Sequence, residues 1–162
     1  MDKQSIYDLL EKCGFWRVIT EHEPVYNMEE AGRLELPYPE SDAKNLFVRD
    51  DKKRNYYLIS VKGDKRVDLK DFRAKHGTRS LSFASDDDLF KYLGVEPGAV
   101  TPLGLLNDKA CAVKFFIDSS LCGEDGLISV HPCDNSATVC MKTADLIELL
   151  REHGTEVEIT DF

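Results

Sequence analysis

Short apolar runs, each closed by a glycine or a polar turn, most limit what this chain can fold into. The longest of them, such as Ala112 to Ile117, ends in charge far short of the roughly 20 apolar residues that a membrane-spanning helix needs. Apolar residues still make up 42% of the 162 residues and charged residues 31%, which is an ordinary globular balance. Because no segment repeats and no Pro/Gly/Ser linker separates two cores, we expect one folded domain over residues 1–162.

Helix caps and glycine stops predict five helices in this domain. The spacing of apolar residues favours alternating or buried strands between them. The expected helices are one that Gly14 ends, 27–34 with a capping-box-like start, 68–76, 85–93, and one that Thr143 caps and Gly154 ends. The expected strands are 15–20, 45–49, 56–61, 112–117, 127–131, 137–141 and 156–160, with an extended loop at 37–39 and a further loop at 98–107.

The irregular order of these elements predicts the fold class. Runs 45–49 and 56–61 flank a polar turn and should form a hairpin. Helices and strands that alternate without a strict repeat indicate an α+β or mixed α/β domain with a curved or barrel-like sheet flanked by helices. Residues 1–4 do not begin a signal peptide, so we expect a cytoplasmic protein without a membrane partner.

The net charge of −9 hides a polarised distribution. Arg49 to Arg79 carries 11 Lys/Arg against 5 Asp/Glu, and the rest of the chain carries 10 against 25. Phosphate binding depends on Lys and Arg, so the average charge excludes a general nucleic-acid binder, and we expect no DNA partner. Any nucleic-acid face should lie within the basic segment.

The common catalytic and metal-binding patterns are absent from the sequence. The four histidines are scattered, and the five cysteines form no Cys-x-x-Cys pair, so neither a metal site nor a disulfide framework is predicted, and we expect no cofactor. There is no nucleophile elbow and no phosphate-binding loop. Cys133 beside His131 suggests a thiolate nucleophile or a redox role, but a small buried side chain explains this cysteine equally simply.

Three local features remain as candidates for chemistry. Lys44 stands at the start of an apolar strand, where its ammonium can bind a phosphate or polarise a carbonyl, although a solvated lysine looks the same. The loop from Pro97 to Pro102 holds a glycine between two prolines and can aim backbone N–H groups at an oxyanion, although it also fits a plain turn. His131 precedes Pro132 at a strand end, where it can face a cleft or serve the core.

Taken together, these features resemble the YbaK/ProX family of trans-acting prolyl-tRNA editing proteins, with the ProX branch closer. The motifs are Lys44-Asn45-Leu46-Phe47, Gly98-x-x-x-Pro102 and His131-Pro132-x-Asp134-Asn135-x-Ala137-Thr138. The resemblance covers most of the chain and extends to the insertion domain of bacterial prolyl-tRNA synthetases. It implies a YbaK-like fold, no metal, and hydrolysis of the ester of Ala-tRNA(Pro).

The resemblance also implies roles for individual residues. Lys44, Gly98 and His131 would form the catalytic site, and the substrate-binding residues would be Asn45, Ala99, Val100, Thr101 and Pro102. A water activated partly by the ribose hydroxyl of the substrate would attack the ester, with loop N–H groups stabilising the oxyanion.

The expected macromolecular partner is the acceptor end of mischarged tRNA(Pro), and prolyl-tRNA synthetase is left open as a second partner. Basic side chains would contact the tRNA phosphates, or would simply be solvated. They are Lys52, Lys53, Arg54, Lys65, Arg66, Lys70 and Arg73. Two alternatives stay open: a Cys-, Ser- or Thr-tRNA deacylase of the same family, and a binding protein for aminoacyl-tRNA or a small ligand without hydrolysis.

Overall fold

The computed structural model describes the backbone of residues 1–162 and every side chain except that of Met28. Its strands form two sheets. The five-stranded sheet has the order β4-β2-β3-β5-β8, and the three-stranded sheet has the order β1-β7-β6. The strands are β1 (Arg17–Glu21), β2 (Ala43–Asp50), β3 (Tyr56–Lys62), β4 (Leu81–Phe83), β5 (Val113–Asp118), β6 (Leu127–Val130), β7 (Ala137–Lys142) and β8 (Val157–Thr160).

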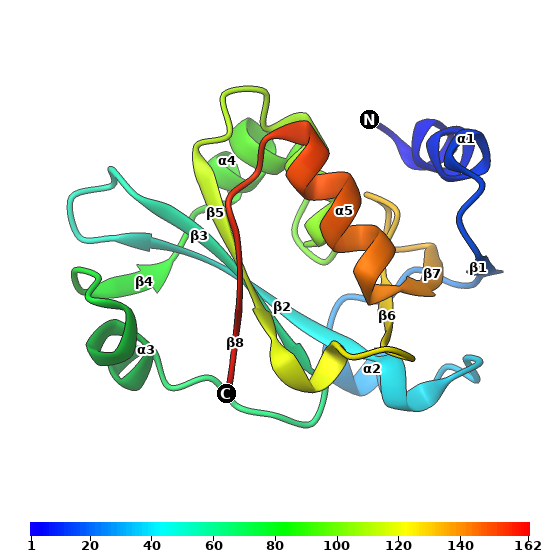
Figure 1. Ribbon diagram of the computed structural model, residues 1–162, viewed down its shortest axis with the longest axis horizontal. Coiled ribbons are helices and arrows are strands. Elements are labelled where there is room, and N and C mark those ends of the chain that lie inside the picture. Colours follow the sequence, from blue (N-terminus) through cyan, green and yellow to red (C-terminus); the bar gives the residue numbers. More distant parts are fainter.

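Five α-helices and several short turns of other helix types connect the strands (Figure 1). The α-helices are α1 (Lys3–Cys13), α2 (Met28–Gly32), α3 (Leu69–His76), α4 (Asp86–Asp88) and α5 (Thr143–His153). The short turns are η1 (Pro39–Ser41), the π-helical η2 (Leu89–Leu93), η3 (Pro102–Asn107) and η4 (Ser119–Leu121). The mixed α/β class is therefore confirmed, and within the described residues the strands do not close into a barrel.

Most of the local predictions are confirmed because they depend on contacts between near neighbours. Gly14, Gly77 and Gly94 end their helices in the left-handed conformation, at φ of 67°, 65° and 65°. The Asp68 side chain accepts from the backbone N–H groups of Lys70 and Asp71 at the start of α3. β2 and β3 form the expected antiparallel hairpin, with Val48 opposite Tyr57.

Four details differ from the sequence-based expectations. The 37–39 segment does not stay extended, because Tyr38 adopts a φ of 55° and leads into η1. The second half of the 98–107 loop is helical, as η3, and a short strand, β4, pairs with the end of β2. Thr143 is the first residue of α5 and donates its hydroxyl to the Leu121 carbonyl at 2.6 Å, so it does not cap the helix.

The main core lies between the two sheets and beneath α1 and α5. It contains residues such as Leu10, Phe47, Phe115, Met141 and Leu150. A second cluster, which includes Val48, covers the opposite face of the larger sheet, where Phe72 of α3 packs on Phe116. The split follows from side-chain alternation along β2, which sends Phe47 to one face and Val48 to the other.

The two sheets meet at a single backbone bridge. Asp42, just before β2, pairs in parallel with Ser129 of β6. Behind this bridge, the Ser41 and Ser129 hydroxyls lie 2.6 Å apart in a buried hydrogen bond. These contacts hold the beginning of β2 against the end of β6. The candidate site lies at this junction of the two sheets.

Candidate active site

A cavity of about 280 Å³ lies where the two sheets meet. Segments far apart in the sequence form its walls: the stretch around α2, the start of β2, the loop of residues 97–102 (the Gly98 loop), the end of β6 and the start of β7. The lining residues are Val25, Tyr26, Asn27, Ala31, Leu34, Leu36, Asp42, Ala43, Lys44, Asn45, Leu46, Gly98, Val100, Ser129, Val130, His131 and Thr138. The volume is near the lower end of the range for small-molecule sites, about 300–1,000 Å³, so this space suits a small group.

Lys44 and Asn45, the second and third residues of β2, line the cavity. The Asn45 amide is held in place because its Oδ1 accepts from the Ser60 hydroxyl on β3. Among the described side chains, no carboxylate forms an ion pair with Lys44, whereas Lys65 and Arg49 each have one. The Lys44 ammonium is therefore available to an anionic or carbonyl oxygen in the cavity.

The Gly98 loop forms the wall opposite. Gly98 has φ of +92°, and a Cβ built on it would lie 3.2 Å from Cδ1 of Tyr26 and 3.5 Å from the Val25 carbonyl oxygen. Glycine is needed here both for the backbone conformation and for the close approach of Tyr26. The Ala99 N–H donates to the Glu96 carbonyl at 3.1 Å, so the donors that this loop can offer a ligand are the amides of Gly98 and Val100.

Thr101 fastens this loop to the end of β6. Its fully buried hydroxyl donates to the His131 carbonyl at 2.6 Å and accepts from the Leu103 N–H at 3.3 Å. The structure thus brings Lys44, Asn45, Gly98, Val100 and His131 to one cavity. The other predicted substrate-binding residues, Ala99, Thr101 and Pro102, are buried behind the cavity wall and do not line it.

His131 lines the cavity and can offer Nε2 to a ligand as a hydrogen-bond acceptor. Its Nδ1–H donates to the Ala137 carbonyl at 2.8 Å, since a carbonyl oxygen can only accept. Burial lowers the pKa of His131, which favours the neutral ring. In that tautomer Nε2 carries a lone pair and no proton.

Asp42 and Thr138 are polar cavity residues that were not predicted as site residues, although Thr138 stands in the His131 motif. Burial raises the pKa of the Asp42 carboxyl. The Thr138 hydroxyl is 2.8 Å from Nε2 of His22, whose Nδ1–H donates to the Glu23 carbonyl at 2.8 Å, so in the neutral ring Thr138 is the donor. Asp42 stands only two residues before Lys44, but no local pattern links His22 to Thr138 across 116 residues.

Residues 22–149 match the family profile of the aminoacyl-tRNA editing domain. The chain belongs to this family. The matched stretch contains every residue that lines the cavity. The editing domain is 40% identical to the prolyl-tRNA editing protein ProX of Acetoanaerobium sticklandii over 152 residues, which are 94% of this chain and 92% of the relative.

A second relative agrees with this assignment, and a solved structure agrees with the fold. The editing domain is 33% identical to the mouse (Mus musculus) prolyl-tRNA synthetase associated domain-containing protein 1, over 89% of this chain and 86% of the relative. A crystal structure named as a candidate trans-editing enzyme for prolyl-tRNA synthetase superposes with a TM-score of 0.72 and 21% identity, covering 99% of this chain and 96% of the other. This likeness confirms the fold.

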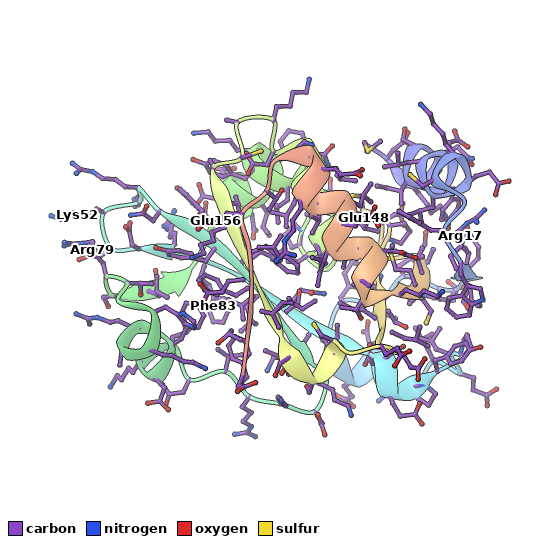
Figure 2. The ribbon with its side chains drawn as sticks, viewed as in Figure 1. Arg17, Lys52, Arg79, Phe83, Glu148 and Glu156 are labelled. Atoms are coloured by element: carbon purple, nitrogen blue, oxygen red, sulfur yellow. The ribbon has the colours of Figure 1, made fainter. Side chains whose placement is uncertain are left out.

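The predicted tRNA-binding side chains of the editing domain do not form a single patch beside the cavity. Lys52, Lys53 and Arg54 occupy the tip of the β2–β3 hairpin, at the end of β2 that lies away from Lys44, and Figure 2 shows Lys52 at the far edge of the molecule. From Lys44 to Asp50 the strand spans about 20 Å at ~3.3 Å per residue.

The four remaining basic residues lie elsewhere. Lys70 and Arg73 line a shallow depression between α3 and β4, and Arg66 is exposed in the loop before α3. Lys65 pairs with the buried Asp118 carboxylate at 2.9 Å. Its charge is therefore largely engaged inside the protein.

Among the described side chains of the editing domain, no group of three or more His, Cys, Asp or Glu is placed to hold a metal ion. All five cysteines are free thiols. Burial raises the pKa of the Cys133 thiol to about 11, which is opposite to what a thiolate nucleophile requires. No helix in the described part of the chain is long and apolar enough to span a membrane.

Proposed function

We propose that this editing domain hydrolyses the ester of mischarged tRNA(Pro) in trans, with Ala-tRNA(Pro) as its substrate. The observation that carries the proposal is the convergence of Lys44, the Gly98 loop and His131 on one small cavity. Support comes from the prolyl-tRNA editing protein that is 40% identical over nearly the whole chain. The catalytic unit is the single domain 1–162, and prolyl-tRNA synthetase, which produces the mischarged tRNA, is its proposed partner.

The ester would lie between Lys44 and the Gly98 loop. Lys44 binds the carbonyl oxygen or the 3′-terminal phosphate, and the amides of Gly98 and Val100 stabilise the oxyanion. A water molecule attacks the carbonyl carbon and gives a proton to the neighbouring ribose hydroxyl, which passes its own proton to the ester oxygen of the ribose. The ester C–O bond then breaks, the ribose oxygen leaves with a proton, and the free amino acid is released.

Acceptors on the other side of the cavity suit the α-ammonium group of the amino acid. They are the Asp42 carboxylate, Nε2 of His131 and the Thr138 oxygen. The Thr138 O–H group donates its hydrogen bond to the neutral His22 ring, which leaves the lone pairs of the oxygen for the ligand. An ammonium group provides three donors and no acceptor, so it matches this set. The side chain of the amino acid would then face the apolar wall formed by Val25, Leu34 and other apolar residues.

The proposed activity answers a limit on how well a synthetic site discriminates by size. A synthetic site for proline cannot exclude a smaller amino acid by binding alone, because each missing methylene is worth only ~1–3 kcal/mol. A second site that accepts only small products can hydrolyse them. In this proposal the Lys44 cavity is that second site, with the apolar wall of Val25 and Leu34 facing the side chain.

Release of amino acid from Ala-, Cys- and Pro-tRNA(Pro), with and without chelator, tests the proposal. The wild type should release alanine and spare proline, with no effect of chelator. Lys44→Ala should lower the rate by about 100-fold or more, the usual cost of losing one oxyanion-stabilising group. Lys109→Ala, which removes an exposed lysine away from the cavity, is the matched control and should leave the rate unchanged.

Each alternative predicts a different outcome. Preferential release of cysteine would keep the chemistry and change the substrate. Binding of Ala-tRNA(Pro) without hydrolysis would instead support a non-catalytic binding protein. Full activity of Lys44→Ala would refute the role of Lys44.

A further inference from the structure

Tyr26 is an exposed aromatic residue at the mouth of the cavity. It lines the cavity and yet has 67% of its surface exposed. The other exposed aromatic residues, Trp16, Tyr38, Phe83 and Phe90, do not line it. Trp16 and Tyr38 pack against each other edge-on at 5.6 Å, and Figure 2 shows Phe83 on the β4 side of the molecule. Among the described residues, no aromatic ring packs on Tyr26.

The backbone around Tyr26 is held firmly. The Tyr26 N–H donates to Oε2 of Glu30 at 2.8 Å. The preceding Val25 carbonyl accepts from the Asn135 amide at 2.8 Å, and the Val25 N–H donates to the Asn135 carbonyl at 3.3 Å. Because this backbone is already held, a flat ligand that packs on the ring does not have to order it, which lowers the entropic cost of binding.

The Tyr26 ring also lies against Gly98, where the ester is proposed to bind. Its Cδ1 lies so close to Gly98 that a Cβ there would be 3.2 Å away. Gly98 supplies one of the two amides proposed to bind the oxyanion. A group attached to the ester through its ribose oxygen must therefore leave the cavity next to Tyr26.

We infer that Tyr26 is the platform on which the 3′-terminal nucleobase of the aminoacylated RNA stacks. The inference rests on the proposed function, because it places the ester at Gly98. With the aminoacyl group inside the cavity, the nucleoside lies toward the rim, where the tyrosine ring both lines the cavity and is exposed. Stacking on an aromatic ring is the usual way for proteins to hold an unpaired base, and it tolerates any base.

Two non-hydrolysable analogues separate this contact from the rest of the site. One is adenosine that carries alanine on its ribose through an amide, and the other is the same compound with hydrogen in place of the base. Calorimetry should show that the wild type binds the base-bearing analogue about 5- to 150-fold more tightly, the range that stacking on one ring provides. Tyr26→Leu should abolish this preference, Tyr26→Phe should retain it, and Phe90→Leu, the matched exposed control, should not change it.

Steady-state deacylation of Ala-tRNA(Pro) gives a second readout. Tyr26→Leu should raise KM and leave kcat close to the wild-type value, since stacking acts on a part of the substrate that does not react. The inference is overturned if the wild type binds neither analogue, shows no preference between them, or keeps its preference in Tyr26→Leu. If the wild type prefers the base-bearing analogue through Tyr26 and yet fails to hydrolyse Ala-tRNA(Pro), the proposed function fails alone.

Discussion

Replacing Thr101 with valine tests whether one buried hydroxyl holds the Gly98 loop to the end of β6. The Thr101 side chain is fully buried, donates to the His131 carbonyl at 2.6 Å and accepts from the Leu103 N–H at 3.3 Å as the N-cap of η3. Valine has nearly the same shape, so it removes both hydrogen bonds without leaving a cavity. The loss is therefore one of hydrogen bonding rather than of packing.

The expected loss of stability follows from these two contacts. Loss of an N-cap costs about 1 kcal/mol, and a buried carbonyl left without a partner costs about 1–3 kcal/mol. Thr101→Val should thus lower the free energy of unfolding by about 2–4 kcal/mol, and Tm by about 4–16 °C for a chain of this size. Urea denaturation measures the change, and Thr101→Ser, which keeps the hydroxyl, should stay within about 1 kcal/mol of the wild type. A valine variant within about 0.5 kcal/mol of the wild type would refute the reasoning.

Two other substitutions test the electrostatics of the protein. Asp42→Asn should raise the free energy of unfolding at pH 7 but not near pH 3, as followed by urea denaturation. Burial raises the pKa of Asp42 above its ordinary value of 3.8, so at pH 7 the folded state disfavours the carboxylate and asparagine removes that cost. Near pH 3 the carboxyl is largely neutral in both the folded and the unfolded state, so the substitution gains little. An equal gain in stability at both pH values would contradict this reasoning. Lys65→Ala should destabilise by about 1–3 kcal/mol because Asp118, with 0% of its side chain exposed, loses its cation. Lys52→Ala, at the exposed hairpin tip, should stay within about 0.5 kcal/mol, and equal stabilities of the two variants would show that the Lys65 contact is not structural.

The site was predictable to the extent that its residues occur in short motifs. Lys44, Gly98 and His131 stand in such motifs, and the structure places all three at one cavity. The capping of α3 by Asp68 could likewise be predicted, because the cap and the N–H groups that it accepts are within three residues of each other. Ala99, Thr101 and Pro102 occur in the same loop motif, but their burial behind the cavity wall could not be inferred from spacing alone.

Sequence by itself determined the elements whose stabilising contacts are local: the Asp68 cap, the glycine stops and the β2–β3 hairpin. Only the tertiary structure decided how they assemble. It divides the strands into two sheets joined at the Asp42–Ser129 bridge, places Tyr26 on Gly98, and links His22 to Thr138. It also pairs Lys65 with Asp118, and the sequence alone does not distinguish this lysine from the solvated lysines near it in the chain. The physical reason is that each of these contacts joins residues far apart in the chain, so packing and burial determine it rather than local propensity.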